Sequence, residues 1–230
     1  MVKELKIENK VIDIYYKEKS LKELPVVILN TYGKEGQEVW NKCLDIKCKD
    51  YILVSISNLN WNNEMTPWYS EKINEKGEEF LGKADEYIQI MLNEIIPKVK
   101  NYIERDLEVK IKYYIISGYS LAGLFAIYAS YKTNIFSKIV SASGSLWFPK
   151  FVDFVKENKI SSNVEKIYFS LGNKESKVKN QILASVEKNT KEIEEIYKNQ
   201  GIKTIYVENE GNHFKDAPLR LAKGIKWILE

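Results

Sequence analysis

Hydrophobic positions along this chain fall into two alternating patterns. Short apolar runs rich in Val and Ile, such as residues 25–30, have the length and content of strands that are buried on both faces of a parallel sheet. Between them lie longer stretches in which apolar residues recur every three or four positions, the spacing of an amphipathic helix. The predicted strands span 25–30, 51–57, 113–116, 138–141, 164–171 and 203–208, and the predicted helices span 37–47, 78–103, the stretch after 120, 177–200 and 218–229. This alternation predicts an α/β fold with a mostly parallel sheet and helices on both of its faces.

Two segments depart from this alternation. The strand-like runs Val2–Ile7 and Val11–Tyr16 are joined by three polar residues and predict an N-terminal antiparallel hairpin at an edge of the sheet. The tract 58–76, rich in Asn and Trp, predicts irregular structure. Within the helix that follows, Pro97 predicts a kink or a division into two helices, because proline cannot donate a backbone hydrogen bond in a helix interior.

Composition and charge narrow the classes of function. With 230 residues, 44% of them hydrophobic, and no repeat or linker, residues 1–230 are expected to form a single domain with a sizeable core. The net charge of +3 comes from nearly balanced charges spread along the chain, which argues against a nucleic-acid partner. The charged amino terminus and the lack of a long apolar run argue against secretion and a membrane partner, and they predict a cytoplasmic protein. The sequence does not indicate an oligomeric state.

The sequence also gives no indication of a metal or a cofactor. Cys43 and Cys48 are too few for a disulfide framework, and their spacing matches no zinc site. We find no carboxylate or histidine cluster suited to a metal and no phosphate-binding loop. Two reduced thiols and a protein without metal or cofactor are therefore expected.

The stretch Gly118-Tyr-Ser-Leu-Ala-Gly123 carries the first candidate for chemistry. A buried strand is predicted before it and a helix after it, which places Ser120 on a sharp strand-to-helix turn where a serine hydroxyl is exposed as a nucleophile. Small residues must flank such a turn, and here the second small position is Ala122 rather than glycine. A chance match to Gly-x-Ser-x-Ala is the alternative, and the strand, the helix and a histidine far downstream argue against it.

Two further residues complete the candidate catalytic group. His213, the sole histidine, follows the last predicted strand and is the candidate base that takes the proton of Ser120. The alternative is a structural histidine packed against Phe214. Glu175 follows the strand at 164–171 and is the candidate acid that holds His213 in one tautomer. Because Glu175 also precedes a predicted helix, its alternative role is to stabilise the N-terminus of that helix.

The remaining candidates surround the expected reaction centre. An oxyanion would be bound by the N–H of Leu121 and by that of Tyr32 or Gly33, in the loop after an early strand. Trp61 and Trp68 follow the strand at 51–57 and would line a shallow, partly aromatic substrate pocket that suits short acyl chains. The alternative is that both tryptophans cover the core.

Several segments follow one another in the order and spacing of a known family. These segments are Met65-Thr-Pro67, 80–87, 118–128, 143–147, 170–175 and 211–214. They resemble the enterochelin-esterase-like putative esterase family of the α/β-hydrolase superfamily, over most of the chain from about residue 25 onward. The resemblance implies the α/β-hydrolase fold and a serine hydrolase that acts on esters, with Ser120 as nucleophile and His213 as base. Some members rely on a Ser–His pair alone, so the resemblance leaves the role of Glu175 open.

These observations together predict a serine carboxylic-ester hydrolase that forms an acyl-enzyme and acts on a small or short-chain ester. The chain has few arginines to hold an anionic siderophore, so enterochelin itself is not expected as the substrate. Two alternatives stay open. One is an acyltransferase on the same fold, and the other is a catalytically inactive binding module with a hydrolase fold.

Overall fold

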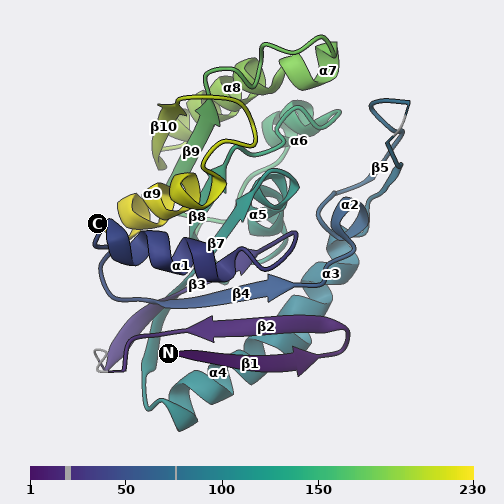
Figure 1. Cartoon of the computed structure of the whole chain (residues 1–230). Coiled ribbons are helices and arrows are strands. Elements are labelled where there is room, and N and C mark those ends of the chain that lie inside the picture. Colours follow the sequence, from purple (N-terminus) through teal and green to yellow (C-terminus); the bar gives the residue numbers. More distant parts are fainter. Residues whose placement is uncertain (19–21, 76) are drawn as a thin grey trace.

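The computed structural model describes residues 1–18, 22–75 and 77–230, and its main feature is a twisted sheet between two layers of helices (Figure 1). The strands are β1 Val2–Ile7, β2 Lys10–Tyr15, β3 Glu23–Asn30, β4 Ile52–Ser57, β7 Lys110–Tyr119, β8 Phe136–Ala142, β9 Lys166–Gly172 and β10 Lys203–Asn209. Within the described residues they form one sheet of eight strands in the order β1-β2-β4-β3-β7-β8-β9-β10. A separate pair, β5 (Tyr69–Ser70) and β6 (Phe80–Leu81), lies outside this sheet.

Strand direction in the large sheet agrees with the expectation from the sequence. The pairs from β4 to β10 along the sheet are parallel, whereas β1 pairs antiparallel with β2, and β2 with β4. The mostly parallel sheet with an N-terminal antiparallel hairpin at its edge is therefore confirmed. Helices cover both faces, and the whole arrangement is the α/β-hydrolase fold.

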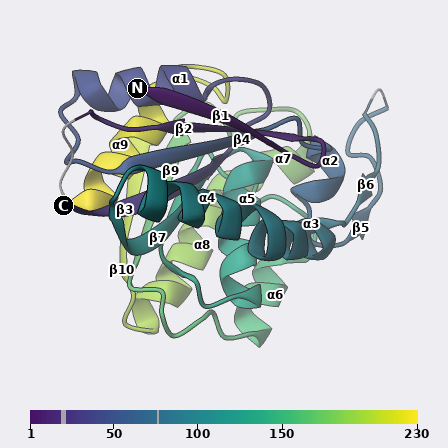
Figure 2. The ribbon, with the colours of Figure 1, turned by 90° about the horizontal axis from the view of Figure 1, so that it is seen from below.

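The helices form two layers, as the view from below shows (Figure 2). Their bounds are α1 Gly36–Asp45, α2 Trp61–Glu64, α3 Ala84–Ile90, α4 Ile96–Asn101, α5 Leu121–Lys132, α6 Phe151–Glu157, α7 Gln181–Ala184, α8 Val186–Asn199 and α9 Ala217–Leu229. The helices α1 and α9 pack against each other and against one face, while α5 and α8 pack on the other face with α3 and α6 beside them. Residues 121–130 of α5 are all buried, because this helix lies between the sheet and the outer helices.

The long helical stretch differs from its prediction. It begins at Ala84 and runs to Asp106 through two π-helical turns, η1 (Met91–Ile95) and η2 (Tyr102–Asp106). Pro97 lies in the first turn of α4, directly after η1. A proline ring clashes with the carbonyl group four residues earlier, and the wider π turn accommodates that clash without dividing the helix.

Other boundaries also differ. The tract predicted as irregular contains α2 and β5, and its last residue, 76, lies outside the described residues. The helix predicted over 177–200 is replaced by the short α7 and the longer α8, and α6 was not predicted. In the part of the chain that the structure describes, no helix has the length and hydropathy of a membrane span.

Candidate active site

Ser120 lies on the sharp turn between β7 and α5. Its backbone has φ 58° and ψ −125°, a conformation that residues with a side chain rarely adopt. A Cβ atom at Gly118 would lie 2.2 Å from the carbonyl oxygen of Ala122, so only glycine fits two residues before the serine. The predicted context of strand, serine and helix is thus present, and the first turn of α5 leaves the Ser120 hydroxyl facing a pocket.

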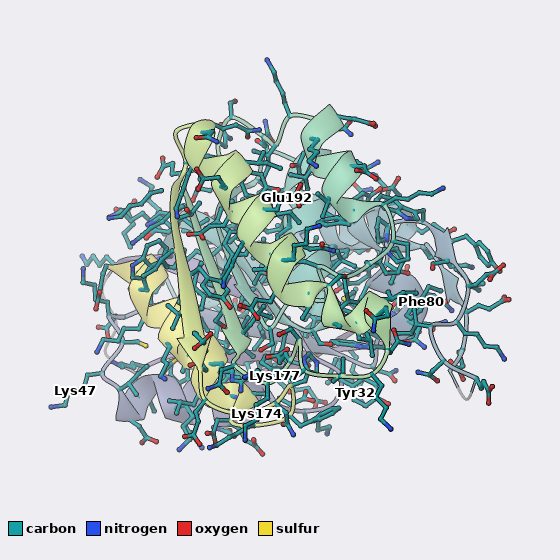
Figure 3. The ribbon with its side chains drawn as sticks, turned by 90° about the horizontal axis from the view of Figure 1, so that it is seen from above. Tyr32, Lys47, Phe80, Lys174, Lys177 and Glu192 are labelled. Carbon is teal, nitrogen blue, oxygen red and sulfur yellow. The ribbon has the colours of Figure 1, made fainter. Side chains whose placement is uncertain are left out.

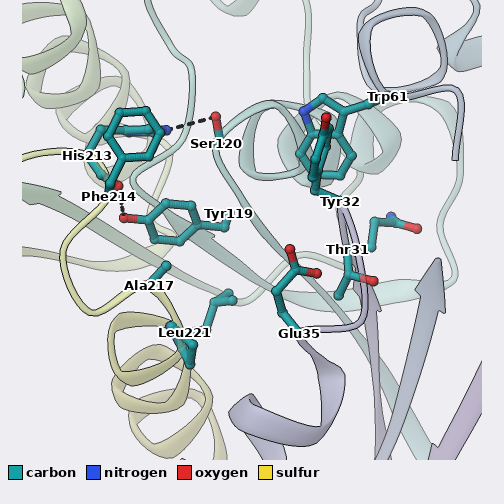
Figure 4. Close-up of a pocket in the computed structure, with 12 residues that line it drawn as sticks. Thr31, Tyr32, Glu35, Trp61, Tyr119, Ser120, His213, Phe214, Ala217 and Leu221 are labelled. Carbon is teal, nitrogen blue, oxygen red and sulfur yellow. Dashed lines mark hydrogen bonds between the residues drawn. The ribbon is translucent and has the colours of Figure 1, made fainter. Parts of the chain in front are cut away.

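The structure brings Ser120, His213 and Glu175 into one hydrogen-bonded chain. Nε2 of His213 lies 3.0 Å from Oγ of Ser120 (Figure 4), and Nδ1 lies 2.7 Å from Oε2 of Glu175. A carboxylate can only accept, so Nδ1 carries the proton and Nε2 is left to accept from the serine hydroxyl. The three side chains come from the turn before α5 and from the loops after β9 and β10, at the carboxyl ends of parallel strands.

Glu175 is almost fully buried, with 7% of its surface exposed. Its Oε1 accepts from the amide of Gly172 at 2.6 Å and from the hydroxyl of Ser143 at 2.8 Å. Burial raises the pKa of this carboxyl, but the His213 ring and the donors Gly172 and Ser143 lower it by more, so the pKa lies below its ordinary value. Glu175 lies six residues before the first residue of α7, and its carboxylate bonds to the histidine rather than to a helix end.

Arg220, from α9, is a site residue that the sequence reasoning missed. It is 1% exposed, and its Nη1 donates to Oε1 of Glu175 at 2.7 Å, to Ser143 Oγ at 2.9 Å and to the Tyr119 hydroxyl at 3.1 Å. Its Nη2 donates to two carbonyl oxygens in the loop that carries His213, those of Glu210 at 3.1 Å and Asn212 at 2.9 Å. The guanidinium group therefore joins the acid to the histidine loop.

Tyr119 makes a second connection to the histidine loop. Its hydroxyl donates to the carbonyl oxygen of His213 at 2.7 Å. Burial raises the pKa of Tyr119, so this hydroxyl stays protonated and able to donate. The only hint of Arg220 in the sequence is its rarity, because two of the 35 basic residues are arginines, and rarity alone assigns no role. A planar guanidinium with several donors suits a buried carboxylate better than a lysine ammonium does.

Two backbone amides near Ser120 are available to a ligand. The amides of Tyr32 and Leu121 donate to no other group in residues 1–18, 22–75 and 77–230; Tyr32 lines the pocket, and Leu121 directly follows Ser120, which also lines it. The amide of Gly33, the alternative to Tyr32, already donates to Oε2 of Glu35 at 2.9 Å. This contact favours Tyr32 over Gly33 as the second oxyanion donor.

The pocket beside Ser120 has a volume of about 360 Å³. Aromatic and aliphatic side chains form most of its wall, namely those of Tyr32, Trp61, Phe214, Pro218 and Leu221. Tyr32 lies at the surface (Figure 3), 72% exposed, and its ring meets that of Trp61 edge to face at 5.4 Å.

Trp68, unlike Trp61, does not line this pocket. Its ring packs against Phe148, Phe151 and Phe154, and its Nε1 donates to the carbonyl oxygen of Pro149. The expectation that both tryptophans line the pocket is therefore corrected for Trp68. The physical reason is that Trp61 is the first residue of the short helix α2, whereas Trp68 lies beyond its end, where the chain packs against the core between α5 and α6.

Among the described residues, no group of three or more His, Cys, Asp or Glu side chains has an arrangement that could hold a metal ion.

Comparison with known proteins places these features in a family. Residues 16–217 match the family model described as putative esterase. The chain is 26% identical over 179 residues to the uncharacterized protein YbbA of Bacillus subtilis (strain 168), an alignment that covers 74% of this chain and 71% of the relative. Its fold is similar to that of an IroE-like serine hydrolase from Shewanella oneidensis, with a TM-score of 0.76, 16% identity, and coverage of 99% of this chain and 79% of the other. It is also similar to the siderophore hydrolase EstA from Aspergillus nidulans, with a TM-score of 0.72, 17% identity, and coverage of 96% and 89%. The chain belongs to the putative esterase family, and it is an esterase, an enzyme whose substrates are small-molecule esters.

Proposed function

We propose that this esterase is a serine carboxylic-ester hydrolase that works through an acyl-enzyme on small or short-chain esters. The observation that carries the proposal is the hydrogen-bonded chain Ser120–His213–Glu175 on the strained turn, with distances of 3.0 and 2.7 Å. In this proposal Ser120 is the nucleophile, His213 the general base and Glu175 the acid that fixes the histidine tautomer.

The first half of the reaction forms the acyl-enzyme. Oγ of Ser120 attacks the ester carbonyl carbon while its proton passes to Nε2 of His213. The carbonyl oxygen becomes an oxyanion, which accepts from the amides of Leu121 and Tyr32. The C–O bond to the alcohol then breaks, and Nε2 returns the proton to the departing oxygen.

The second half restores the enzyme. A water molecule gives a proton to Nε2 of His213 and attacks the acyl carbon, forming a second oxyanion. When this intermediate collapses, the carboxylic acid departs and Oγ of Ser120 recovers its proton. The ionised Glu175 stabilises the imidazolium in both halves, in keeping with the lowered pKa of its carboxyl.

The size of the pocket supports a short acyl chain. A volume of about 360 Å³ is near the lower end of the range for ligand sites. Each methylene group that enters the apolar wall contributes about 0.8 kcal/mol, and methylene groups that extend beyond it contribute none. We therefore expect kcat/KM to be highest for acetyl to butyryl esters and to fall for chains longer than about eight carbons, because the gain from burial ends once the pocket is full and the excess chain clashes with its wall.

Burst kinetics with p-nitrophenyl esters of graded chain length test this proposal. An acyl-enzyme releases about one equivalent of p-nitrophenol before the slower steady state. Ser120→Ala should abolish the burst and reduce turnover by about a million-fold, whereas the matched Ser145→Ala should keep the burst. Ser145 is a suitable control because its Oγ lies 3.3 Å from Oγ of Ser120. A burst that persists in Ser120→Ala would refute the assignment of the nucleophile, and rates that rise steadily beyond eight carbons would refute the short-chain substrate.

A further inference from the structure

One acidic side chain, Glu35, lies in the wall of the pocket beside Ser120 and His213. It precedes α1, and its carboxylate points toward the space between Tyr119 and Tyr32 (Figure 4). Within the described part of the chain, the Glu35 carboxylate accepts one hydrogen bond, from the amide of Gly33 at 2.9 Å, and forms no ion pair. The carboxylate therefore keeps acceptor capacity that faces the pocket.

No lysine or arginine side chain of the described residues lines the pocket to balance this charge. The nearby guanidinium of Arg220 is directed away from the pocket, onto Glu175 and the histidine loop. A ligand in this pocket thus meets a negative charge on an otherwise mostly apolar wall.

A second polar side chain in the same wall, Asn30, keeps a free hydrogen-bond donor within the described part of the chain. Asn30, at the end of β3, is 1% exposed, and its Oδ1 accepts from the hydroxyl of Tyr87 at 2.6 Å. Burial holds the pKa of Tyr87 well above its ordinary value, so this hydroxyl remains the donor. Nδ2 of Asn30 has no hydrogen-bond partner among the described residues. Because Asn30 lines the pocket, this N–H group is available to an acceptor on a ligand there.

The aromatic side chains beside Glu35 suit a cation as well. Tyr32 and Trp61 meet edge to face at 5.4 Å at the pocket wall. The faces of such rings attract ammonium groups through the negative charge of the ring face, and trimethylammonium groups are bound by aromatic walls of this kind.

We propose that this pocket selects esters that carry a positively charged nitrogen in the acyl or the alcohol part, bound by Glu35 and by the Tyr32 and Trp61 rings. Nδ2 of Asn30 donates to an acceptor oxygen of the same substrate. This inference rests on the proposed function, because the ester is cleaved at Ser120, and it specifies the class of substrate for that site.

Matched cationic and neutral esters test the proposal. On the alcohol side, acetylcholine is compared with 3,3-dimethylbutyl acetate, which has the same shape without the charge. On the acyl side, the p-nitrophenyl ester of 4-(trimethylammonio)butanoic acid is compared with that of 5,5-dimethylhexanoic acid. In at least one pair, kcat/KM should be about tenfold higher for the cation, a difference of about 1.4 kcal/mol. The preference should become smaller at high salt, because ions screen a partly exposed charge.

Two variants on the same segment identify the source of the preference. Glu35→Gln keeps an acceptor oxygen for the Gly33 amide but removes the charge, and it should lower the cation preference severalfold, leaving only the part that the Tyr32 and Trp61 rings supply. Glu38→Gln removes an exposed charge three residues further along α1, outside the pocket, and should keep the preference. In the unaltered enzyme, choline should inhibit hydrolysis of p-nitrophenyl acetate more strongly than 3,3-dimethylbutanol does.

Equal kcat/KM values within both ester pairs would overturn the inference, as would the same cation preference in Glu35→Gln and Glu38→Gln. Equal inhibition of the unaltered enzyme by choline and 3,3-dimethylbutanol would also overturn it. This measurement needs no variant, so it decides the question even if Glu35→Gln fails to fold. These failures differ from failure of the proposed function. If Ser120→Ala hydrolyses the esters as fast as the unaltered enzyme, or if none of the esters is hydrolysed, the proposed function falls and the inference falls with it.

Discussion

Replacement of Arg220 by lysine should weaken both the fold and the reaction, although the charge is kept. The guanidinium makes five hydrogen bonds, three from Nη1 and two from Nη2, and the two groups of acceptors lie on different sides of it. A single lysine ammonium can reach Glu175 and its neighbours but not the carbonyl oxygens of Glu210 and Asn212 as well. The loss of two buried, charge-assisted hydrogen bonds, at about 1.5 kcal/mol each, lowers the free energy of unfolding by about 3 kcal/mol.

The same two hydrogen bonds hold the loop that carries His213, so their loss should also affect kcat. A displacement of the imidazole by about 1 Å is enough to reduce kcat by about a hundredfold. KM should change little, because Arg220 does not line the pocket. Urea unfolding and steady-state kinetics with p-nitrophenyl acetate measure both effects.

The chain offers a matched control, because its other arginine, Arg105, is exposed in η2. Arg105→Lys should stay within about 0.5 kcal/mol of the unaltered protein, as surface substitutions usually do. If Arg220→Lys is as stable and as active as Arg105→Lys, then the two contacts with the histidine loop contribute nothing, and the argument for a positioning role of Arg220 is wrong.

Three further predictions follow from the geometry. The pKa of Glu175 is lowered in the folded protein, so its contribution to the free energy of unfolding is present above the unfolded pKa of about 4.3 and is lost as the pH falls through the lower folded pKa. In urea unfolding, Glu175→Gln should therefore lose less free energy of unfolding between pH 5 and pH 3 than the unaltered protein does. Its kcat should also be at least about a hundredfold lower. Gly118→Ala should destabilise the protein by at least about 2 kcal/mol, since its Cβ would lie 2.2 Å from a carbonyl oxygen of the next helix turn, whereas Gly201→Ala, with φ +81° and open space around it, should cost only about 1 kcal/mol in thermal unfolding. Trp61→Ala should raise KM for short esters with little change in stability, because Trp61 lines the pocket. Trp68→Ala should lower the free energy of unfolding by about 3 kcal/mol and leave KM unchanged, because Trp68 packs in the core. The reverse result would contradict the placement of Trp61 in the pocket and of Trp68 in the core.

The features that the sequence predicts well depend on local pattern and on chain order. Short β-branched runs predict the buried strands, and Gly118, two residues before Ser120, predicts the tight turn. Both features depend on residues that are near one another in the sequence. His213 could be singled out because the chain has no other histidine and because it follows the last strand. Parallel strands bring their carboxyl ends together, so residues 93 positions apart could be expected to meet.

The features that the sequence does not reveal depend on contacts between distant segments. Arg220 lies on a helix whose periodicity marks it only as part of a packed face, and its role depends on Glu175, Ser143 and Tyr119, which belong to three other segments. Similarly, Trp61 and Trp68 have the same local signal, and only the tertiary packing separates the pocket residue from the core residue. The π turn before Pro97 is a response to a steric clash that composition alone does not describe.

Mapping the covalent adduct of a fluorophosphonate probe tests the central claim most directly. Such a probe reacts with a serine whose hydroxyl is activated by a neighbouring base, and peptide mass spectrometry locates the adduct. The proposed reaction predicts one adduct per chain, on Ser120, and no labelling of Ser120→Ala or of protein unfolded in urea. An adduct on another residue, or unchanged labelling of Ser120→Ala, would contradict the role of Ser120 as nucleophile.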